Sequence, residues 1–437
     1  MTTPIFDFVK KYSESKTARF HMPGHKGVSY LGCEKYDITE ICGADVLYSA
    51  DGIINESENN LSSLYGTSHS FYSTEGSTLA IKAMLALVSE RDGEEKPLIL
   101  AARNVHASFV RAAALLDLDV DWIYPAAAGH LCECKISACD VEHAISEAGK
   151  KPSAVYLTSP DYLGNMQDIR GISLVCRKNG IPLLVDNAHG AYLRFLPEDC
   201  HPITLGAAMC ADSAHKTLPV LTGGAYLHVS KDYSEYAEKA RGALSLFAST
   251  SPSYLTLSSL DLCNDRLSTD YCEKISAIAE YVEEIKAKIA NLGFELSGDE
   301  PLKIVIKSGE ELADHLRKNQ IEVEFSDSEY TVLMLTPENE KADFDRLLSS
   351  LSSFENKYRE EINCPKITRH VAKMSIRQAV LWQNETINIE NAVGRVCASP
   401  TVSCPPAVPI VISGEVITEE DVALFKHYRI DTVCVVK

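Results

Sequence analysis

The chain has 437 residues, of which 45% are hydrophobic and 24% are charged. This length exceeds what one compact core usually supports, so two or three domains are expected, and the composition excludes wholesale disorder. The formal net charge of −19 repels nucleic-acid phosphates and anionic membrane surfaces. We therefore expect a soluble protein that binds neither nucleic acid nor membranes.

The N-terminal residues MTTPIFD lack the basic and apolar regions of an export signal, and no stretch approaches the roughly 18 apolar residues that span a bilayer. We expect a cytoplasmic protein whose 14 cysteines are reduced. One cluster of metal-ligand residue types comprises His130, Cys132, Cys134, Cys139 and His143. Its spacing matches no familiar zinc motif, so a polar loop is favoured over a metal site, and no metal is predicted.

Residues 70–230 alternate short apolar runs with amphipathic helical stretches, which is the pattern of a parallel α/β sheet. The pattern predicts a helix over residues 77–90. It predicts buried strands at residues 97–101, 154–158 and 181–185. Each strand is followed by polar residues, and open α/β sheets bind ligands at the carboxyl ends of their strands.

The later part of the chain predicts a second, smaller α+β domain. Residues 231–262 are expected to be mostly helical, and an apolar stripe predicts a long amphipathic helix over residues 273–291. Beyond it, the expected elements are strands at residues 301–307 and 330–335 and a helix at residues 341–358. Prolines exclude a helix at residues 403–409. The predicted domains are an N-terminal segment (1–30), a large α/β domain (31–265) and a smaller C-terminal domain (266–437).

The strongest local signal for chemistry is residues 211–217, ADSAHKT, which place Lys216 after Ser213 and next to His215. A lysine that forms a Schiff base with pyridoxal phosphate needs such a setting, with a hydroxyl group near for the cofactor phosphate. Asp186 follows a predicted strand thirty residues earlier, where its carboxylate would pair with the pyridine nitrogen and hold it protonated. The alternative for Asp186 is a simple turn-capping residue.

Three further segments fit the same site. Residues 74–78, TEGST, open a predicted helix whose first N–H groups, with Gly76 and Ser77, would bind a phosphate. His106 follows a strand and is placed to stack on the pyridine ring, and Ala188 is small enough to pack on the opposite face. Taken alone, each has an ordinary alternative: a capped helix start or a polar loop residue.

Several motifs together resemble the bacterial Orn/Lys/Arg decarboxylase family. They occur in the family order from about residue 19 to residue 430. They are FHMPGHKG (20–27), RNVH (103–106), VDNAHG (185–190), SAHK (213–216), FASTSPSY (247–254), and PPAVPI (405–410) with the following Gly414 and Glu415. The resemblance implies an aspartate-aminotransferase-like (fold type I) pyridoxal phosphate domain with a mostly parallel sheet. It also implies a homodimer with the active site near the subunit interface.

The resemblance also assigns roles to individual residues. Lys216 would form the internal aldimine, Asp186 would bind the ring nitrogen and His106 would stack on the ring. The other implied cofactor-binding residues are Gly76, Ser77, Ala188, His189 and Ser213. Ser249, Thr250 and Ser251 would contact the phosphate of the neighbouring subunit, and Glu415 would meet the distal cation of the substrate.

The implied reaction is α-decarboxylation of arginine, lysine or ornithine, with His215 or Lys216 returning a proton to the α-carbon. The sequence leaves the substrate open, and another fold-type-I activity, an aminotransferase or a carbon–carbon lyase, remains an alternative. A non-catalytic relative is disfavoured because Lys216, Asp186 and His106 are all present.

The chain departs from the family pattern at three places. Asn187 stands where a Glu is usual, Glu75 replaces a neutral residue beside the phosphate loop, and Gly223-Gly224 replaces bulkier or polar residues after the lysine. An acidic side chain beside a phosphate is unfavourable unless it points away or meets a cation. The chain is also too short for the extra N-terminal wing domain of the long family members, so their ring assemblies are not expected.

Overall fold

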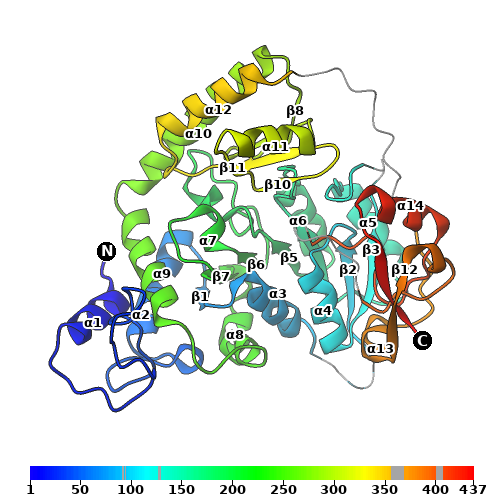
Figure 1. Cartoon of the computed structure of the whole chain (residues 1–437). Helices are drawn as coiled ribbons and strands as arrows, with labels where there is room; N and C mark the ends of the chain where they lie inside the picture. Colours follow the sequence, from blue (N-terminus) through cyan, green and yellow to red (C-terminus); the bar gives the residue numbers. More distant parts are fainter. Residues whose placement is uncertain (91–92, 94, 126–128, 356–368, 400–406) are drawn as a thin grey trace. The chain divides into compact units, whose positions relative to one another are not determined.

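A computed structural model (Figure 1) describes residues 1–90, 93, 95–125, 129–355, 369–399 and 407–437. The chain forms two compact units. Unit 1 comprises Met1–Val88 and Pro182–Ser276, and unit 2 comprises Ser89–Ile181 and Ala277–Lys437. The boundaries of these units differ from the domain boundaries that the sequence predicts. Those domain boundaries stay a prediction.

Unit 1 is an α/β unit built from two separate segments of the chain. Its first segment forms α1 (Pro4–Ser13), α2 (Ile53–Tyr65), β1 (His69–Ser73) and α3 (Gly76–Leu87). Its second segment forms β5 (Leu183–Asp186), β6 (Met209–Asp212), α7 (Ala214–Thr217), β7 (Ala225–Val229), α8 (Glu235–Ser245) and α9 (Tyr254–Leu267). The strand order is β1-β7-β6-β5.

The pairing of β5 with β6 is parallel, with Asp186 opposite Ala211, whereas β7 runs antiparallel to both β1 and β6. The residues of β5, β6 and β7 are all buried, as expected for strands covered on both faces. Helix α3 packs against β6 and β7. Because β5 and β6 are parallel, Asp186 and Asp212 end their strands at the same edge of the sheet.

Unit 2 also begins with a parallel α/β arrangement. Its first segment forms β2 (Leu98–Ala102), α4 (Ala107–Leu116), β3 (Asp119–Ile123), α5 (Ala138–Glu147), β4 (Ala154–Thr158) and α6 (Ile169–Lys178). The strand order is β4-β2-β3, and β2 pairs in parallel with both neighbours. The α/β parts of the two units thus contribute four and three strands to this fold.

The second segment of unit 2 is the α+β part. It contains β8 (Leu296–Ser297), β9 (Lys303–Ile306), α11 (Glu310–Lys318), β10 (Phe325–Ser326), β11 (Thr331–Met334), α12 (Lys341–Ser353), α13 (Ile376–Leu381), β12 (Asn384–Asn388), α14 (Glu419–His427) and β13 (Thr432–Val436). Strands β10-β11-β9-β8 form an antiparallel sheet, and β12 pairs antiparallel with β13. A separate hydrophobic cluster includes Ile410 and Val411 together with residues of α14 and β13, such as Phe425 and Val433.

The predicted elements are confirmed, with shifted ends. The strand expected at 181–185 begins at Leu183, because Pro182 has no N–H group to join the ladder. Helix α12 ends at Ser353, whereas the prediction ran to 358, and residues 356–358 lie outside the described residues. The same holds for residues 403–406 of the proline-rich tail.

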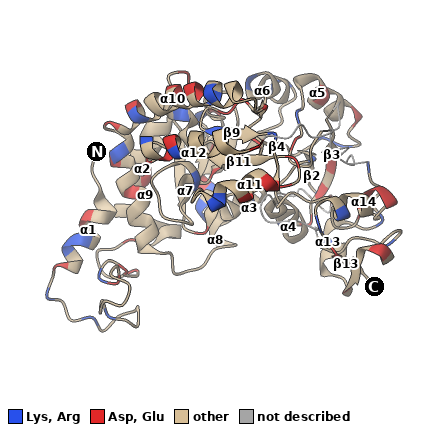
Figure 2. Ribbon diagram, turned by 45° about the horizontal axis from the view of Figure 1, so that its top comes forward, with Lys and Arg blue, Asp and Glu red and all other residues tan. Residues whose placement is uncertain are grey.

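The long helix α10 (Tyr271–Asn291) runs through the boundary between the two units. Four residues of its predicted apolar stripe are fully buried, namely Ile275, Val282, Ile285 and Ile289. Figure 2 shows acidic and basic residues interspersed along the rest of this helix. Within the described residues, no helix combines the length and the apolar character needed to cross a bilayer.

The buried carboxylate of Asp261 fastens the N-terminal helix to unit 1. Asp261 lies on α9 with no exposed surface, and its Oδ2 accepts hydrogen bonds from the N–H groups of Ile5 and Phe6, each at 2.9 Å. These are two of the first N–H groups of α1, which have no partner inside the helix. Ser57 donates to the other oxygen of the same carboxylate.

We expect Asp261→Ala to lower the free energy of unfolding of unit 1 by about 2–3 kcal/mol, because it leaves two helix-start N–H groups, one of them buried, without an acceptor. Thermal and urea denaturation of the full chain measure the change. Asp265→Ala, at an exposed residue that pairs with the N-terminal amine, is the control and should cost less than about 1 kcal/mol. Equal effects of the two substitutions would contradict this account of α1.

Candidate active site

Lys216 lies in the single turn of α7, directly after β6. The turn forms because the N–H of Lys216 donates to the carbonyl of Ser213 at 3.0 Å and the N–H of His215 donates to the carbonyl of Gly224 at 3.1 Å. The Lys216 side chain is half-buried, and its Nζ lies 2.9 Å from Nε2 of His189. The lysine amine is therefore held beside the loop that follows β5.

That loop also carries Asp186 and Ala188. Asp186 is 2% exposed, and its Oδ1 accepts a hydrogen bond from the N–H of Ala188 at 3.2 Å. The N–H of Gly190 donates to the carbonyl of Asn187 at 2.8 Å, which closes the turn. In unit 1 the structure therefore brings together the predicted residues of the 185–190 and 213–216 motifs.

The predicted phosphate site lies at the start of α3. Gly76 begins the helix with φ of +72°, and a side chain placed there would meet no atom within 4 Å, so the space in front of this turn is open. The Ser213 hydroxyl donates to the Ser77 hydroxyl at 2.7 Å. Two hydroxyl groups and the start of a helix therefore lie in one place, which is a suitable setting for a phosphate.

Glu75 and the segment 249–251 meet beside this helix start. Glu75 Oε1 accepts a hydrogen bond from the N–H of Ser249 at 2.7 Å. Ser249, Thr250 and Ser251 are exposed, and their expected contact with a neighbouring subunit stays a prediction. The Glu75 carboxylate thus has a donor in its own chain, which explains how an acidic residue is accommodated beside the phosphate loop.

Gly223 has a backbone reason to be glycine. Its φ is +95°, and a Cβ atom would lie 2.8 Å from the carbonyl oxygen of Thr74. Its own carbonyl accepts a hydrogen bond from the N–H of Gly76 at 2.8 Å. Residue 223 therefore packs backbone against backbone on the phosphate loop, and a bulkier residue would displace that loop.

Burial lowers the pKa of His215, and the positive charge of Lys216 lowers it further. His215 Nδ1 lies 2.9 Å from the carbonyl oxygen of Gly224, so Nδ1 carries the hydrogen and Nε2 is the acceptor in the neutral ring. At neutral pH this favours His215 as a hydrogen-bond acceptor. Lys216 is the better candidate to hold a transferable proton.

His106 lies in unit 2, at the N-cap of α4. Its Nδ1 accepts a hydrogen bond from the N–H of Ser108 at 3.1 Å and lies 2.8 Å from the Ser108 hydroxyl. The half-buried imidazole is therefore held in one orientation by the helix that it caps. Its stacking on a cofactor ring stays a prediction.

Glu415 also lies in unit 2 and is only 3% exposed. Its Oε2 accepts a hydrogen bond from the N–H of Ile412 at 2.7 Å and lies 3.5 Å from Nη2 of Arg103. Arg103, 1% exposed, also donates to the carbonyls of Pro409 and Ile410 at 2.9 and 2.7 Å. The Glu415 carboxylate thus has partners in its own chain, and its contact with a substrate cation stays a prediction.

The first histidine of the cysteine-rich loop has partners in its own chain. His130 Nε2 lies 2.7 Å from Oδ2 of Asp327 and 3.1 Å from the hydroxyl of Tyr428. Cys132 and Cys134 are buried, whereas Cys139 is exposed. His130 thus ties its loop to Asp327, in the loop after β10, and to Tyr428, directly after α14.

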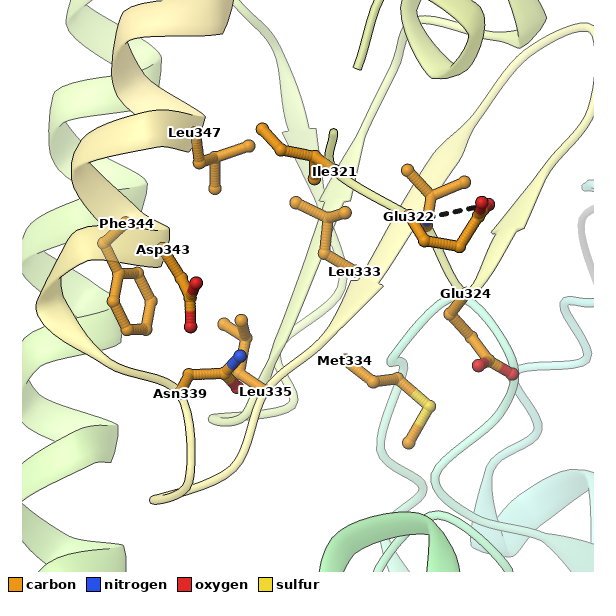
Figure 3. A pocket seen from close by; sticks show the side chains of 11 residues that line it. Ile321, Glu322, Glu324, Leu333, Met334, Leu335, Asn339, Asp343, Phe344 and Leu347 are labelled. Carbon is orange, nitrogen blue, oxygen red and sulfur yellow. Dashed lines mark hydrogen bonds between the residues drawn. The ribbon is translucent and has the colours of Figure 1, made fainter. Parts of the chain in front are cut away.

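A separate hollow of about 320 Å³ lies beside α12 in unit 2 (Figure 3). Apolar residues such as Ile321, Leu333 and Leu347 line it, together with Glu322 and Glu324. Glu322 accepts a hydrogen bond from Arg317, and Glu324 accepts one from the hydroxyl of Tyr162. None of the predicted site residues lines this hollow.

A fully buried polar group next to the Asn187 turn was not predicted from the sequence. Asp212, His201 and His228 have no exposed surface, and Asp212 Oδ1 accepts a hydrogen bond from Nδ2 of Asn187 at 2.8 Å. Asp212 stands inside the 211–217 heptad, and His228 is a polar residue within the apolar run of β7. A polar residue in the middle of a buried strand was the signal that could have pointed to this group.

Two family models and several known proteins match this chain, and most of them are decarboxylases by name. The family model "Orn/Lys/Arg decarboxylase, major domain" matches residues 3–307, and "Orn/Lys/Arg decarboxylase, C-terminal domain" matches residues 356–431. An uncharacterized protein of Bacillus subtilis, YaaO, is 29% identical, and an arginine decarboxylase of the same organism is 28% identical. Each alignment covers 97% of this chain and 93% of the relative.

Among solved structures, the lysine decarboxylase LdcF of Francisella novicida matches with a TM-score of 0.82 at 18% identity, over 99% of this chain and 79% of the other. At this identity the match shows the fold. The fold is therefore the expected aspartate-aminotransferase-like fold (fold type I), with the C-terminal α+β part.

We expect Glu415→Ala to destabilise unit 2 by about 3 kcal/mol, because it leaves the Arg103 guanidinium buried without its carboxylate. The drop in melting temperature of the full chain measures the effect. Glu322→Ala is the control, because its carboxylate and its partner Arg317 are 77% and 41% exposed, and exposed ion pairs contribute less than about 1 kcal/mol. A melting temperature that Glu415→Ala leaves unchanged would show that the buried pair is not needed for folding.

Proposed function

This chain belongs to the Orn/Lys/Arg decarboxylase family, a family of amino-acid decarboxylases, and from that membership we propose that it decarboxylates arginine, lysine or ornithine with pyridoxal phosphate bound to Lys216. The observation that carries the proposal is the convergence in unit 1 of the Lys216 amine, the Asp186 carboxylate and the Ser77–Ser213 hydroxyl pair. The relatives named arginine decarboxylase match over nearly the whole chain.

The residues present suit the cofactor. The open space at Gly76 and the two hydroxyls at the start of α3 fit its phosphate. The buried Asp186, at the end of β5, is of the residue type that would pair with a protonated ring nitrogen. Ala188, half-buried after Asp186, and His106 remain the proposed residues for the two faces of the ring.

When bound, the cofactor supplies an electron sink for the electrons released when CO2 leaves the substrate. The residues of the chain would position the reacting groups and return a proton to the α-carbon of the substrate. Lys216 is the residue that would hold the cofactor, and its amine, once released and protonated, would be the proton source for the α-carbon. His189, 2.9 Å from Lys216 Nζ, orients that amine, and His215, whose pKa is lowered, would offer Nε2 as a hydrogen-bond acceptor.

The substrate is proposed as a class, because arginine, lysine and ornithine share a distal cation. The net charge of −19 favours approach of a cationic substrate. Glu415 remains the proposed partner of the distal group, in a homodimer whose active site lies near the subunit interface, and the proposed location is the cytoplasm. The second candidate function, another fold-type-I reaction such as amino transfer, rests on the three departures at Asn187, Glu75 and Gly223-Gly224.

The proposal is tested by incubating the purified full chain with pyridoxal phosphate and each of arginine, lysine and ornithine. CO2 release with formation of the matching amine is expected for one of them. Amino transfer to 2-oxoglutarate is measured in parallel. Transfer without CO2 release would reject decarboxylation in favour of the second candidate.

Lys216→Ala should abolish the visible absorbance band of the lysine-bound cofactor and lower the rate of CO2 release about a thousandfold or more, because both the covalent attachment and the proton source are lost. Lys231→Ala, at an exposed lysine of the same unit, is the control and should leave both unchanged. A visible band in Lys216→Ala that survives dialysis and is lost on borohydride reduction would place the attachment on another lysine.

Glu75→Gln should tighten the binding of pyridoxal phosphate about threefold, because it removes a negative charge beside the phosphate and keeps an oxygen that accepts from the Ser249 N–H. Spectroscopic titration of the cofactor-free chain measures the dissociation constant. Glu235→Gln, an exposed acid at the start of α8, is the matched control. Weaker binding by Glu75→Gln would show that the carboxylate organises the loop rather than repelling the phosphate.

A further inference from the structure

The buried group around Asp212 bridges the two loops of the proposed cofactor site. Asp212 ends β6 and directly precedes Ser213 and the turn that carries Lys216. Asn187 directly follows Asp186 at the end of β5. Asn187 Nδ2 donates to Asp212 Oδ1 at 2.8 Å, and the N–H of Asn187 donates to the carbonyl of Ala211 at 3.0 Å. Asn187 is therefore hydrogen-bonded to β6 through both its backbone and its side chain.

Asp212 is held as a carboxylate although it has no exposed surface. His201 Nε2 lies 3.0 Å and His228 Nε2 3.4 Å from its Oδ2. Burial by itself would raise the pKa of Asp212, but the two histidines beside it hold that pKa well below its usual value. The Ser70 hydroxyl lies 2.7 Å from Nδ1 of His228 and fixes that ring. A buried carboxylate surrounded by donors is a rigid acceptor.

The Asp212 carboxylate accounts for the departure from the family pattern at residue 187. A Glu there would direct a second carboxylate toward Asp212, and two buried carboxylates side by side are strongly unfavourable. Asn supplies a donor instead. Asn187 and Asp212 therefore form a complementary pair, and each residue requires the other.

Resting on the function proposed above, we propose that Asp212 is a positioning residue: through Asn187 it fixes the turn that carries Asp186 against the turn that carries Lys216. Asp212 does not contact the reacting atoms. It acts by keeping the ring-nitrogen partner and the lysine amine at a constant separation, so that both can engage one cofactor.

The same side chains include metal-ligand types, because the ligand atoms of His201, Cys210 and Asp212 lie within 4.8 Å of one another. Their atoms are already used for hydrogen bonds, since Cys210 Sγ donates to Asp212 Oδ1 at 3.5 Å. Burial and the negative charge of Asp212 raise the pKa of the Cys210 thiol, which disfavours the thiolate that a metal needs. We therefore interpret these side chains as a hydrogen-bonded network and not as a metal site.

The test is a double-mutant cycle on the full chain. Asn187→Asp sets two carboxylates against each other, and Asp212→Asn replaces the charged acceptor by a weaker, neutral one. The double variant restores one amide–carboxylate pair in the reverse direction, with an amide at 212 and a carboxylate at 187. The dissociation constant of pyridoxal phosphate, the shape of its visible band and the melting temperature are recorded. We expect each single variant to weaken cofactor binding about tenfold, and the double variant to bind more tightly than either.

Two further variants separate positioning from folding. Asn187→Ala removes the donor without adding charge and should also weaken binding about tenfold. Asp261→Asn is the matched control, a fully buried carboxylate of unit 1 that holds α1. It should lower the melting temperature and leave the dissociation constant and the band unchanged.

Three results would overturn the inference. The first is single variants with wild-type affinity and band shape; the second is a double variant as weak as the product of the two singles. The third is one equivalent of metal in the purified wild type that is lost in Asp212→Asn, because the group would then be a metal site. A wild-type chain that binds no pyridoxal phosphate would overturn the proposed function itself, and the inference with it.

Discussion

The parallel pairing of β5 with β6 is the constraint on which the proposed site depends. It sets Asp186 opposite Ala211 and brings the ends of both strands to one edge of the sheet. Two loops that are far apart in the sequence then begin side by side, one carrying Asp186 to His189 and the other Ser213 to Lys216. The 2.9 Å approach of Lys216 Nζ to His189 Nε2 follows from that register. A shift of one residue would turn Asp186 to the opposite face of the sheet.

Two buried carboxylates lie at this edge of the sheet, and their burial costs free energy because it removes them from water. Asp186 and Asp212 are 2% and 0% exposed, and a buried carboxylate is tolerated only when donors replace the water it has lost. For Asp212 the donors are Asn187 and His201, and His228 Nε2 lies 3.4 Å from the same carboxylate. The adjoining phosphate loop is rigid for a different reason, because Gly76 and Gly223 meet backbone to backbone. One side of the site is held by buried charge and the other by close main-chain packing.

Much of this could be predicted from the sequence, because the information is local. The strand at 154–158, the helix that opens at Gly76 and the lysine turn after β6 each follow from apolar runs and the residues that end them. The family motifs predicted the fold that the solved lysine decarboxylase shares. The partners of Glu415 could not be predicted in this way, because Arg103 lies 312 residues away. The same applies to Asp212, whose histidine partners come from a loop and from β7.

The three residues that depart from the family pattern share one feature, which is a specific contact with a neighbouring residue. Asn187 has the donor that the Asp212 carboxylate needs, Glu75 accepts the N–H of Ser249, and Gly223 leaves room for the carbonyl of Thr74. Each residue is fitted to a neighbour within unit 1 rather than to a new ligand. Departures of this kind change how a site is supported and not which groups it presents. This is the reason to expect the decarboxylase chemistry of the family to be retained while the affinity for the cofactor differs.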